Sequence, residues 1–407
     1  MSSRHHLLAR VCLLLLMAHA CLASPPAGAA PDEAGYGADQ GYPRSSLETM
    51  SQKPYLVDAH TAMERMFRST PVRRGEHPVR PLPPAAQPLQ WSELDTYLAT
   101  HPATGLMILK DGKVFAERYQ YGRTAVQRFT SWSMAKTVVA MAVGIAIEEK
   151  HIHSIDDPVD RYEPALALTA WKGVSIRHVL HMASGVKFDE TYGVANSDVA
   201  QLSRAWSRQQ RSLAEVLAGM TEREVAAGQR FKYISADTEV LGLVLAKATG
   251  RPLAGYVSEK IWGPMGAEDD ASWLIDAKGV EAASCCLNAR LRDYARLGQL
   301  LLDGGRNGER QVIPREWVES ATSVRFRDGY LQPRRATPYL GYGYQVWLLP
   351  DDLGYALLGV RGQAVYVHPR LKLVMVQTAV YPEFVNNELG GQRDRFWRAL
   401  VFRATRL

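Results

Sequence analysis

The sequence RFTSWSMAKTVVAMAVGIAI, residues 128–147, decides the fold of this chain. Its second part, residues 137–147, is apolar on all sides but only about half as long as a membrane span, which predicts a helix buried in the protein interior. Ser133 and Lys136 stand three residues apart where this helix begins. On a helix that spacing places both side chains on one face, so the sequence sets a hydroxyl beside an amine.

This pairing has a chemical use and a structural alternative. A serine hydroxyl becomes a nucleophile when a base takes its proton, and a partly desolvated lysine with a lowered pKa is such a base. Backbone N–H groups at the start of the helix would stabilise an oxyanion. The alternative is a helix-capping Ser133 with a snorkelling Lys136. Ser184-Gly-Val-Lys187 has the same spacing, and Ser133 is favoured because it opens the buried helix.

A second motif lies in GQRFKYISADTEVLG, residues 228–242. Tyr233 and Ser235 stand just before an apolar helical pattern, where a tyrosine held near a serine and a lysine can pass a proton to a leaving group. Tyr256-Val-Ser258 repeats the short pattern, but it lacks the phenylalanine before it and the Leu-Gly after it. We therefore assign the role to Tyr233.

The flanking segments predict an α+β fold. TGLMILKDGKVFAERYQYG, residues 104–122, consists of two strand-like runs about Asp111-Gly112, a strong hairpin signal. Several β-rich segments follow residue 340, and an amphipathic helix closes the chain. We expect the sheet part at about 89–130 and 321–407, with a helical insert at about 131–320.

Taken together, these motifs resemble the β-lactamase and penicillin-binding serine hydrolases. The likeness extends to SIRHVLHMASGV, 175–186, and LNARLRDYARLGQLLLDGG, 287–305, in the family's order over about 91–405. Within the family the chain is most similar to the class C-like group, which includes esterases, D-amino acid peptidases and 6-aminohexanoate-oligomer hydrolases. The resemblance implies a β-lactamase/D,D-peptidase-like fold, an antiparallel sheet flanked by terminal helices with a large inserted helical domain.

The resemblance also implies roles for individual residues. Ser133 would be acylated, Lys136 and Tyr233 would share the proton transfers, and Ser235 would lie near the leaving group. FDETYGV, residues 188–194, resembles the loop that supplies a substrate-contacting tyrosine in the oligomer hydrolases. Tyr192 is thus a substrate-binding candidate, with a buried tyrosine bonded to backbone as the alternative.

The third family motif departs from the family pattern. Its counterpart is Gly359-Val360-Arg361-Gly362-Gln363, with no Lys or His in front. All five are substrate-binding candidates, because the glycines would let substrate lie along a strand edge and the N–H of Val360 would complete an oxyanion hole. Arg361 is either a bidentate partner of a substrate carboxylate or a surface arginine. The departure favours amide or ester hydrolysis over β-lactam hydrolysis.

The N-terminus predicts export. Residues 1–23 have the basic start, short apolar run and small residues of a signal peptide, and 24–88 are a Pro-, Gly- and Ala-rich tether or surface arm. We expect a periplasmic or secreted protein, with peripheral envelope association possible in principle and a lipid anchor at Cys21 disfavoured. For the adjacent Cys285 and Cys286, whose bridge would be a strained ring, we expect two small residues in a packed turn.

Composition narrows the function classes. With 46% hydrophobic residues in 407 the chain can bury a full core, and its net charge of +6 is scattered. We expect no nucleic-acid partner, no metal site and no cofactor, and the oligomeric state stays open. The predicted function is hydrolysis of a small amide or carboxylic ester through an acyl-enzyme on Ser133. The alternatives are a D,D-peptidase or β-lactamase acting on cell-wall peptides or penicillins, and a non-catalytic binding protein on the same fold.

Overall fold

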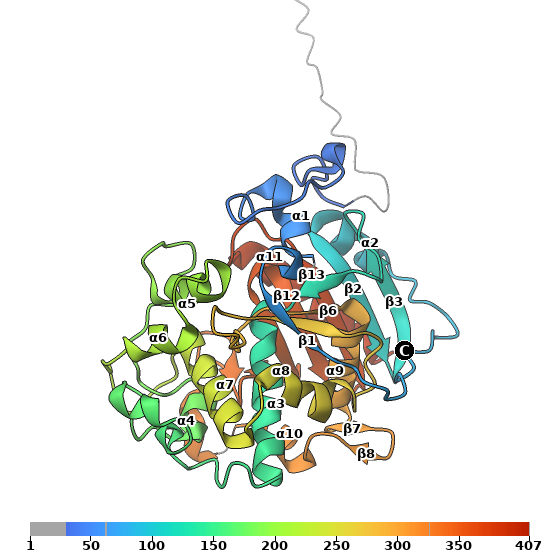
Figure 1. Cartoon of the computed structure of the whole chain (residues 1–407). Coiled ribbons are helices and arrows are strands. Elements are labelled where there is room, and N and C mark those ends of the chain that lie inside the picture. The colour runs from blue at the N-terminus through green and yellow to red at the C-terminus, as the bar shows by residue number, and fades with distance from the viewer. Residues whose placement is uncertain (1–29, 62, 325, 407) are drawn as a thin grey trace, which may run out of the picture.

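The computed structural model of the chain describes residues 30–406, apart from 62 and 325. The predicted signal peptide, Cys21 and the first residues of the predicted arm lie outside the described residues. Figure 1 shows an antiparallel sheet beside a largely helical region. None of the helices in the described part of the chain has the length and apolarity needed to span a bilayer.

The main sheet joins both ends of the domain. Its seven antiparallel strands follow the order β3-β2-β13-β12-β11-β10-β9. The hairpin of β2 (Ala103–Lys110) and β3 (Lys113–Tyr119) turns at Asp111 and Gly112, whose φ angles are 51° and 74°. The remaining strands are β9 (Gly341–Tyr342), β10 (Trp347–Leu348), β11 (Tyr355–Gly359), β12 (Gln363–His368) and β13 (Leu373–Ala379). Because β13 pairs with β2, segments from the two ends of the domain lie side by side in one sheet. The predicted α+β class is confirmed.

Helices cover both faces of this sheet. The terminal helices α2 (Ser92–Thr100) and α11 (Asn387–Ala404) pack on one face, where Trp397 stacks on Tyr366 with ring centroids 5.1 Å apart. On the other face lies α9 (Leu291–Leu302). A Cβ at Gly298 of α9 would stand 2.7 Å from Val374, so glycine permits this close approach.

The central helix of the other region is α3 (Ala135–Glu148), which is buried from Ala135 to Ala146 and packs against α7 (Ser235–Thr249). This is the buried helix that the opening stretch predicts, and its uniform apolarity follows from protein contacts on every side. Around it stand α4 (Ile176–Leu180), α5 (Asp198–Ser207), α6 (Leu213–Ala218), α8 (Leu253–Val257) and α10 (Arg315–Ala321).

The region is less purely helical than the sequence indicated. A second sheet has the order β1-β5-β6-β4, with β1 (Ser69–Val72), β4 (Arg128–Thr130), β5 (Ala271–Leu274) and β6 (Leu287–Arg290). A small hairpin, β7 (Arg306–Asn307) and β8 (Arg310–Gln311), follows α9. Strands of two to four residues are too short to show an alternating pattern, which explains why the sequence did not predict them.

The described part of the predicted arm, residues 30–88, lies packed on the domain. Its strand β1 pairs with β5, and the short helix α1 (Leu56–Ala59) is buried. Tyr36 donates its hydroxyl to the carbonyl of Val380 at 2.8 Å, just beyond β13. In Figure 1 this segment crosses the top of the sheet near α11. These contacts place the arm against the strand end from which the loop to α11 departs.

Candidate active site

Ser133 lies in a single 3₁₀ turn, Trp132–Met134, between β4 and α3. The turn is fixed to β6, because Ser131 N donates to Leu287 O at 2.7 Å and Leu287 N donates to Ser131 Oγ at 3.1 Å. Trp132 adopts a left-handed φ of 44°, a conformation that a non-glycine residue holds only in a well-determined setting. Ser133 itself is partly exposed and lines a cavity, so its hydroxyl is reachable from solvent.

Lys136, one turn further along, is buried with 1% exposure. Its Nζ donates to Ser235 Oγ at 3.1 Å and to the carbonyl of Ser284 at 2.8 Å. Burial lowers the pKa of Lys136 to about 8, although the charges of Glu190 and Glu239 act in the opposite direction. A lysine that is bonded to neutral oxygens and has a lowered pKa is more often in its neutral form, and that form can take a proton.

Tyr233 completes the group at the start of α7. Burial raises the pKa of its phenol well above the usual 10.0, and the nearby Ser133 side chain acts in the opposite direction. Lys136 Nζ stands 5.4 Å from the centre of the Tyr233 ring, whose other neighbour is Trp347 with ring centroids 5.3 Å apart. The structure thus brings Ser133, Lys136, Tyr233 and Ser235 together from two helices far apart in sequence.

The cavity in front of Ser133 has a volume of about 610 Å³, and six of its eighteen lining residues are aromatic. The aromatic side chains are Tyr192, Tyr233, Tyr339, Trp347, Tyr381 and Phe384. Leu358 and Gly359 of β11 also line it, and in the described ladder β10 pairs only as far as Ala356. A short stretch of β11 beyond its pairing with β10 therefore lines the cavity beside Ser133, and such a strand edge can pair with an extended amide chain.

The third motif divides into residues that reach the cavity and residues that do not. Gly359, Val360 and Gly362 line it. A Cβ at Gly359 would stand 2.5 Å from the carbonyl oxygen of Ser131, so glycine lets β11 lie directly against the turn that carries Ser133. Gln363 is buried and bonds the backbone of Arg361 and Ala379, which contradicts its prediction as a substrate contact.

Arg361 is also placed differently from both predicted alternatives. It is 3% exposed, does not line the cavity, and donates through Nη1 to the carbonyls of Tyr381 and Pro382, both at 2.8 Å. Its guanidinium lies 4.2 Å from the ring centre of Phe384. The arginine is thus neither a substrate ligand nor a surface residue; it fixes the segment that carries two aromatic walls of the cavity.

Tyr192 and Ser235 meet at a residue that the sequence analysis missed. Tyr192 lines the cavity and donates its hydroxyl to Glu190 at 2.6 Å, so its partner is a side chain and not backbone. Ser235 is buried behind the wall, bonded to Lys136 and Glu190. The one signal in the sequence was the place of Glu190 two residues before Tyr192.

Cys285 and Cys286 form a disulfide, which corrects the expectation of two unlinked residues in a packed turn. Cys286 has a left-handed φ of 70°, and the indole of Trp273 donates to the carbonyl of Cys285 at 2.8 Å. On one side the carbonyl of Ser284 accepts a hydrogen bond from Lys136, and on the other Leu287 N donates to Ser131, beside the turn that carries Ser133. These contacts on both sides determine the unusual backbone conformation that the bridge needs.

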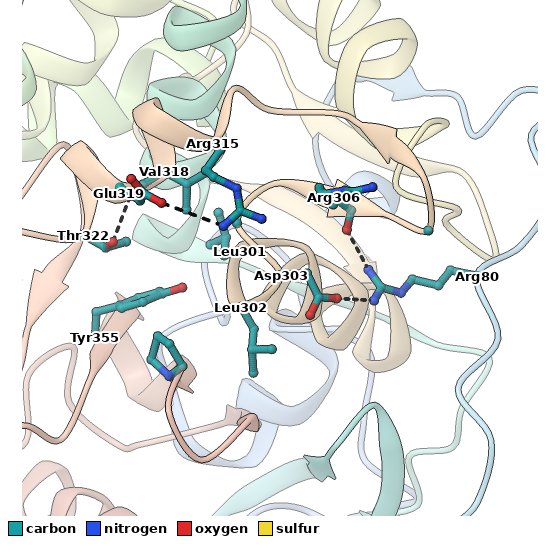
Figure 2. Close-up of a pocket in the computed structure, with 13 residues that line it drawn as sticks. Arg80, Leu301, Leu302, Asp303, Arg306, Arg315, Val318, Glu319, Thr322 and Tyr355 are labelled. Carbon is teal, nitrogen blue, oxygen red and sulfur yellow. Dashed lines mark hydrogen bonds and ion pairs between the residues drawn. The ribbon is translucent and has the colours of Figure 1, made fainter.

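A second cavity, of about 720 Å³, lies near the end of α9 and has a different character (Figure 2). Figure 2 shows Arg80 directed at the carboxylate of Asp303 and at the carbonyl of Arg306, and Arg315 facing Glu319. Four of its charged side chains form two ion pairs, Arg80 with Asp303 and Arg315 with Glu319, and its described lining holds no serine or cysteine. The larger hollow therefore lacks the chemistry that the Ser133 cavity has.

The chain is similar to known proteins of one family. A model of the Beta-lactamase family matches residues 93–384. A 6-aminohexanoate-dimer hydrolase of Paenarthrobacter ureafaciens is 27% identical over 358 residues, covering 85% of this chain and 90% of that protein.

Solved structures share the fold. A Bacillus anthracis protein provisionally named a 6-aminohexanoate-dimer hydrolase is 23% identical, covers 88% of this chain and 96% of its own, and superposes with a TM-score of 0.78. A D-stereospecific amidohydrolase from a Streptomyces species is 17% identical, covers 70% and 92%, and gives a TM-score of 0.51. The chain therefore belongs to the Beta-lactamase family of hydrolases.

Proposed function

We propose that this protein hydrolyses a small amide or carboxylic ester through an acyl-enzyme on Ser133. The observation that carries the proposal is the buried amine of Lys136, bonded to two neutral oxygens one turn from a solvent-reachable serine. In the described part of the chain no carboxylate lies within ion-pair distance of that amine. A lysine that served structure alone would gain more from a carboxylate partner.

In acylation, the neutral amine of Lys136 takes the proton of Ser133 while Oγ forms a bond to the substrate carbonyl carbon. We expect the N–H groups of Ser133 and Val360 to stabilise the oxyanion. Tyr233 gives its phenolic proton to the leaving nitrogen or oxygen as the carbon–heteroatom bond breaks, and it regains a proton from the ammonium of Lys136.

In deacylation the same groups act in reverse. Water gives a proton to the base formed by Lys136 and Tyr233 while its oxygen bonds to the acyl carbon. The bond to Ser133 Oγ then breaks, Ser133 regains a proton, and the acid leaves. Each group ends in its starting protonation state, so the cycle requires water and no cofactor.

The aromatic cavity and the short strand edge support a substrate with an apolar, extended chain on one side of the scissile bond. The names of the relatives support an amide, since one acts on a 6-aminohexanoate dimer and another is an amidohydrolase. The third motif supplies no cation toward the cavity, because Arg361 is turned inward. Arg393 does line the cavity, but its guanidinium is bonded to the Tyr366 hydroxyl and to Asp394. An arginine already paired in this way counts against a preference for penicillins, whose carboxylate needs a partner.

Intact-mass analysis tests the proposal. The protein is mixed with p-nitrophenyl esters of increasing chain length, a linear amide, a D-alanyl peptide and a penicillin. We expect acyl adducts with the esters, turnover of the amide, and no adduct in Ser133→Ala. Stable labelling by the penicillin would favour the D,D-peptidase alternative, and adducts that persist in Ser133→Ala would remove the assignment.

We also propose that the mature protein works in an oxidising compartment. The predicted signal peptide and the disulfide of Cys285 and Cys286 support this. Fractionation of cells should recover the protein outside the cytoplasm, and Cys21→Ala should leave its aqueous partitioning in detergent unchanged. Recovery in the cytoplasm at full length would contradict the proposal.

A further inference from the structure

Glu190 lies at the meeting point of the loop that carries Tyr192 and the helix that begins at Ser235. Its carboxylate accepts three hydrogen bonds: from Ser235 N at 2.7 Å, from Ser235 Oγ at 2.6 Å and from the Tyr192 hydroxyl at 2.6 Å. A carboxylate that accepts bonds at this distance is a strong, charge-assisted partner. It does not line the cavity, so it acts on substrate only through its neighbours.

The hydrogen bond from Ser235 fixes the direction of a proton. A serine hydroxyl has one hydrogen and two lone pairs, and here the hydrogen goes to Glu190. Ser235 Oγ therefore presents a lone pair to Lys136 Nζ, which donates to it at 3.1 Å. One N–H group of Lys136 is therefore used in the hydrogen bond to Ser235.

The other partner of Lys136 is the carbonyl of Ser284, which can only accept. A neutral amine has two N–H groups and one lone pair. When both N–H groups bond to Ser235 Oγ and Ser284 O, the lone pair is left for the remaining direction. Ser133 stands three residues before Lys136 in the turn that leads into α3, so we infer that it lies in that remaining direction.

We propose that Glu190 is a positioning residue that, by accepting the hydroxyl proton of Ser235, turns the lone pair of Lys136 toward Ser133. The inference rests on the proposed function and adds to it a role for Glu190, which sets the directions of the hydrogen bonds at Ser235 and Lys136. Replacement by glutamine would exchange one acceptor oxygen for a donor. Ser235 could then turn its hydrogen toward Lys136 and compete for the lone pair.

Glu190 also contributes to the charge balance around Lys136. The groups that face the amine are Tyr233, Asp237 and Glu239 on or beside α7 and Glu190 on the loop. Burial lowers the pKa of Lys136, and among the carboxylates that raise it Glu190 acts most strongly. Removal of the charge of Glu190 should therefore shift the acid limb of the rate profile to lower pH.

The experiment compares Glu190→Gln, Glu190→Asp and the matched control Glu222→Gln in the full-length protein. Glu222 is an exposed glutamate paired with Lys187, away from the cavity lining. Initial rates with a p-nitrophenyl ester are measured from pH 5.5 to 10, with melting temperatures as a check on folding.

We expect Glu190→Gln to lower kcat by about 10- to 100-fold while KM changes less than about threefold, since misdirected reacting groups slow chemistry more than binding. Its acid limb should move below that of the wild type. Glu190→Asp keeps charge and acceptors and should recover part of kcat with an unshifted limb, and Glu222→Gln should match the wild type. Wild-type kcat and an unshifted limb for Glu190→Gln would overturn the inference.

Two further variants keep the test decisive. If Glu190→Gln melts well below the wild type, Ser235→Ala removes the same relay without touching the carboxylate, and wild-type kcat for it overturns the inference. When both variants fold, the double variant Glu190→Gln/Ser235→Ala should be no slower than Ser235→Ala. The hydrogen bond from Ser235 to Glu190 is already lost in Ser235→Ala, so the second substitution removes nothing further from it. Failure of the proposed function is recognised separately, since Ser133→Ala would then remain active.

Discussion

Two places in this molecule have a serine three residues before a lysine, and their structures are opposite. At Ser133 the serine reaches a cavity and Lys136 is buried. At Ser184 the serine is buried at 1% exposure and the side chain of Lys187 is 62% exposed, paired with Glu222. The backbone between Ser184 and Lys187 is not helical, so the two side chains do not share a face.

The difference shows which physical property the proposed reactivity of the Ser133 pair depends on. The spacing is the same, but only a buried amine loses the hydration that keeps a lysine charged. Burial lowers the pKa of Lys136 to about 8, while the ion pair with Glu222 raises the pKa of Lys187 above the usual 10.5. For a lysine to act as base toward a serine, the serine hydroxyl must be exposed and the lysine amine must be buried.

The largest effect should come from removing the two serine hydroxyls in turn. Ser133→Ala should lower kcat/KM by about 10³-fold or more and abolish labelling by a fluorophosphonate, because the bond-forming atom is gone. Ser184→Ala should stay labelled. Labelling lost in Ser184→Ala and kept in Ser133→Ala would reverse the comparison.

The two lysines should differ nearly as much. Lys136→Met keeps the apolar volume but removes the base, so kcat/KM should fall by about 10²- to 10⁴-fold. Lys187→Met, in an exposed pair, should stay within about twofold. Equal losses in the two variants, measured with the same ester, would show that burial is not what distinguishes them.

Tyr233→Phe should separate leaving groups. The phenol is needed to protonate a leaving amine, whereas p-nitrophenolate leaves without a proton, so turnover of an amide should fall about 100-fold and that of the ester by less. Steady-state rates on an amide and an ester of the same acid check this. Equal losses on both would indicate that Tyr233 acts on the attacking step alone.

The pH profile should report Lys136 and not Lys187. Below the pKa of about 8 the amine is protonated and cannot accept the proton of Ser133, so kcat/KM should fall about tenfold per pH unit. Above it the rate should level off. The pH profile of Lys187→Met should coincide with that of the wild type. If the wild-type rate rises only near pH 10, the base has the pKa of an ordinary, exposed lysine and the prediction is wrong.

The smallest effect concerns the glycine between Ser184 and Lys187. Gly185 has a φ of 76°, and a Cβ there would meet the carbonyl oxygen of Val225 at 2.2 Å. Gly185→Ala should lower the free energy of unfolding by about 1–3 kcal/mol and leave kcat unchanged, since the segment serves the fold. Denaturant unfolding with kinetics on the folded fraction measures both, and lost kcat at full stability would contradict the structural role.

Much of the fold was predictable because its signals are local. The hairpin about Asp111-Gly112 and the apolar helix after Lys136 each depend on residues close in sequence, and both are present. The short strands β5 and β6 were not predicted, because a few residues in a ladder are determined by the partners that pair with them.

The proximity of three predicted site residues could be expected from the sequence for the same reason. Ser133, Lys136 and Tyr233 lie in motifs with a fixed local geometry, and the structure brings them together. Arg361 was misjudged, because its partners are backbone carbonyls about twenty residues away. Sequence spacing carries no information on such contacts.

The sequence by itself determined which groups are available: a serine and a lysine at helical spacing, a tyrosine before a second helix, and the α+β pattern. Only the tertiary structure decided which serine–lysine pair is buried in the required sense and which proton faces which lone pair. Burial and hydrogen-bond direction at Lys136 depend on Glu190 and Ser284, which the fold brings from 54 and 148 residues away. A pKa is set by those neighbours, so it cannot be read from spacing alone.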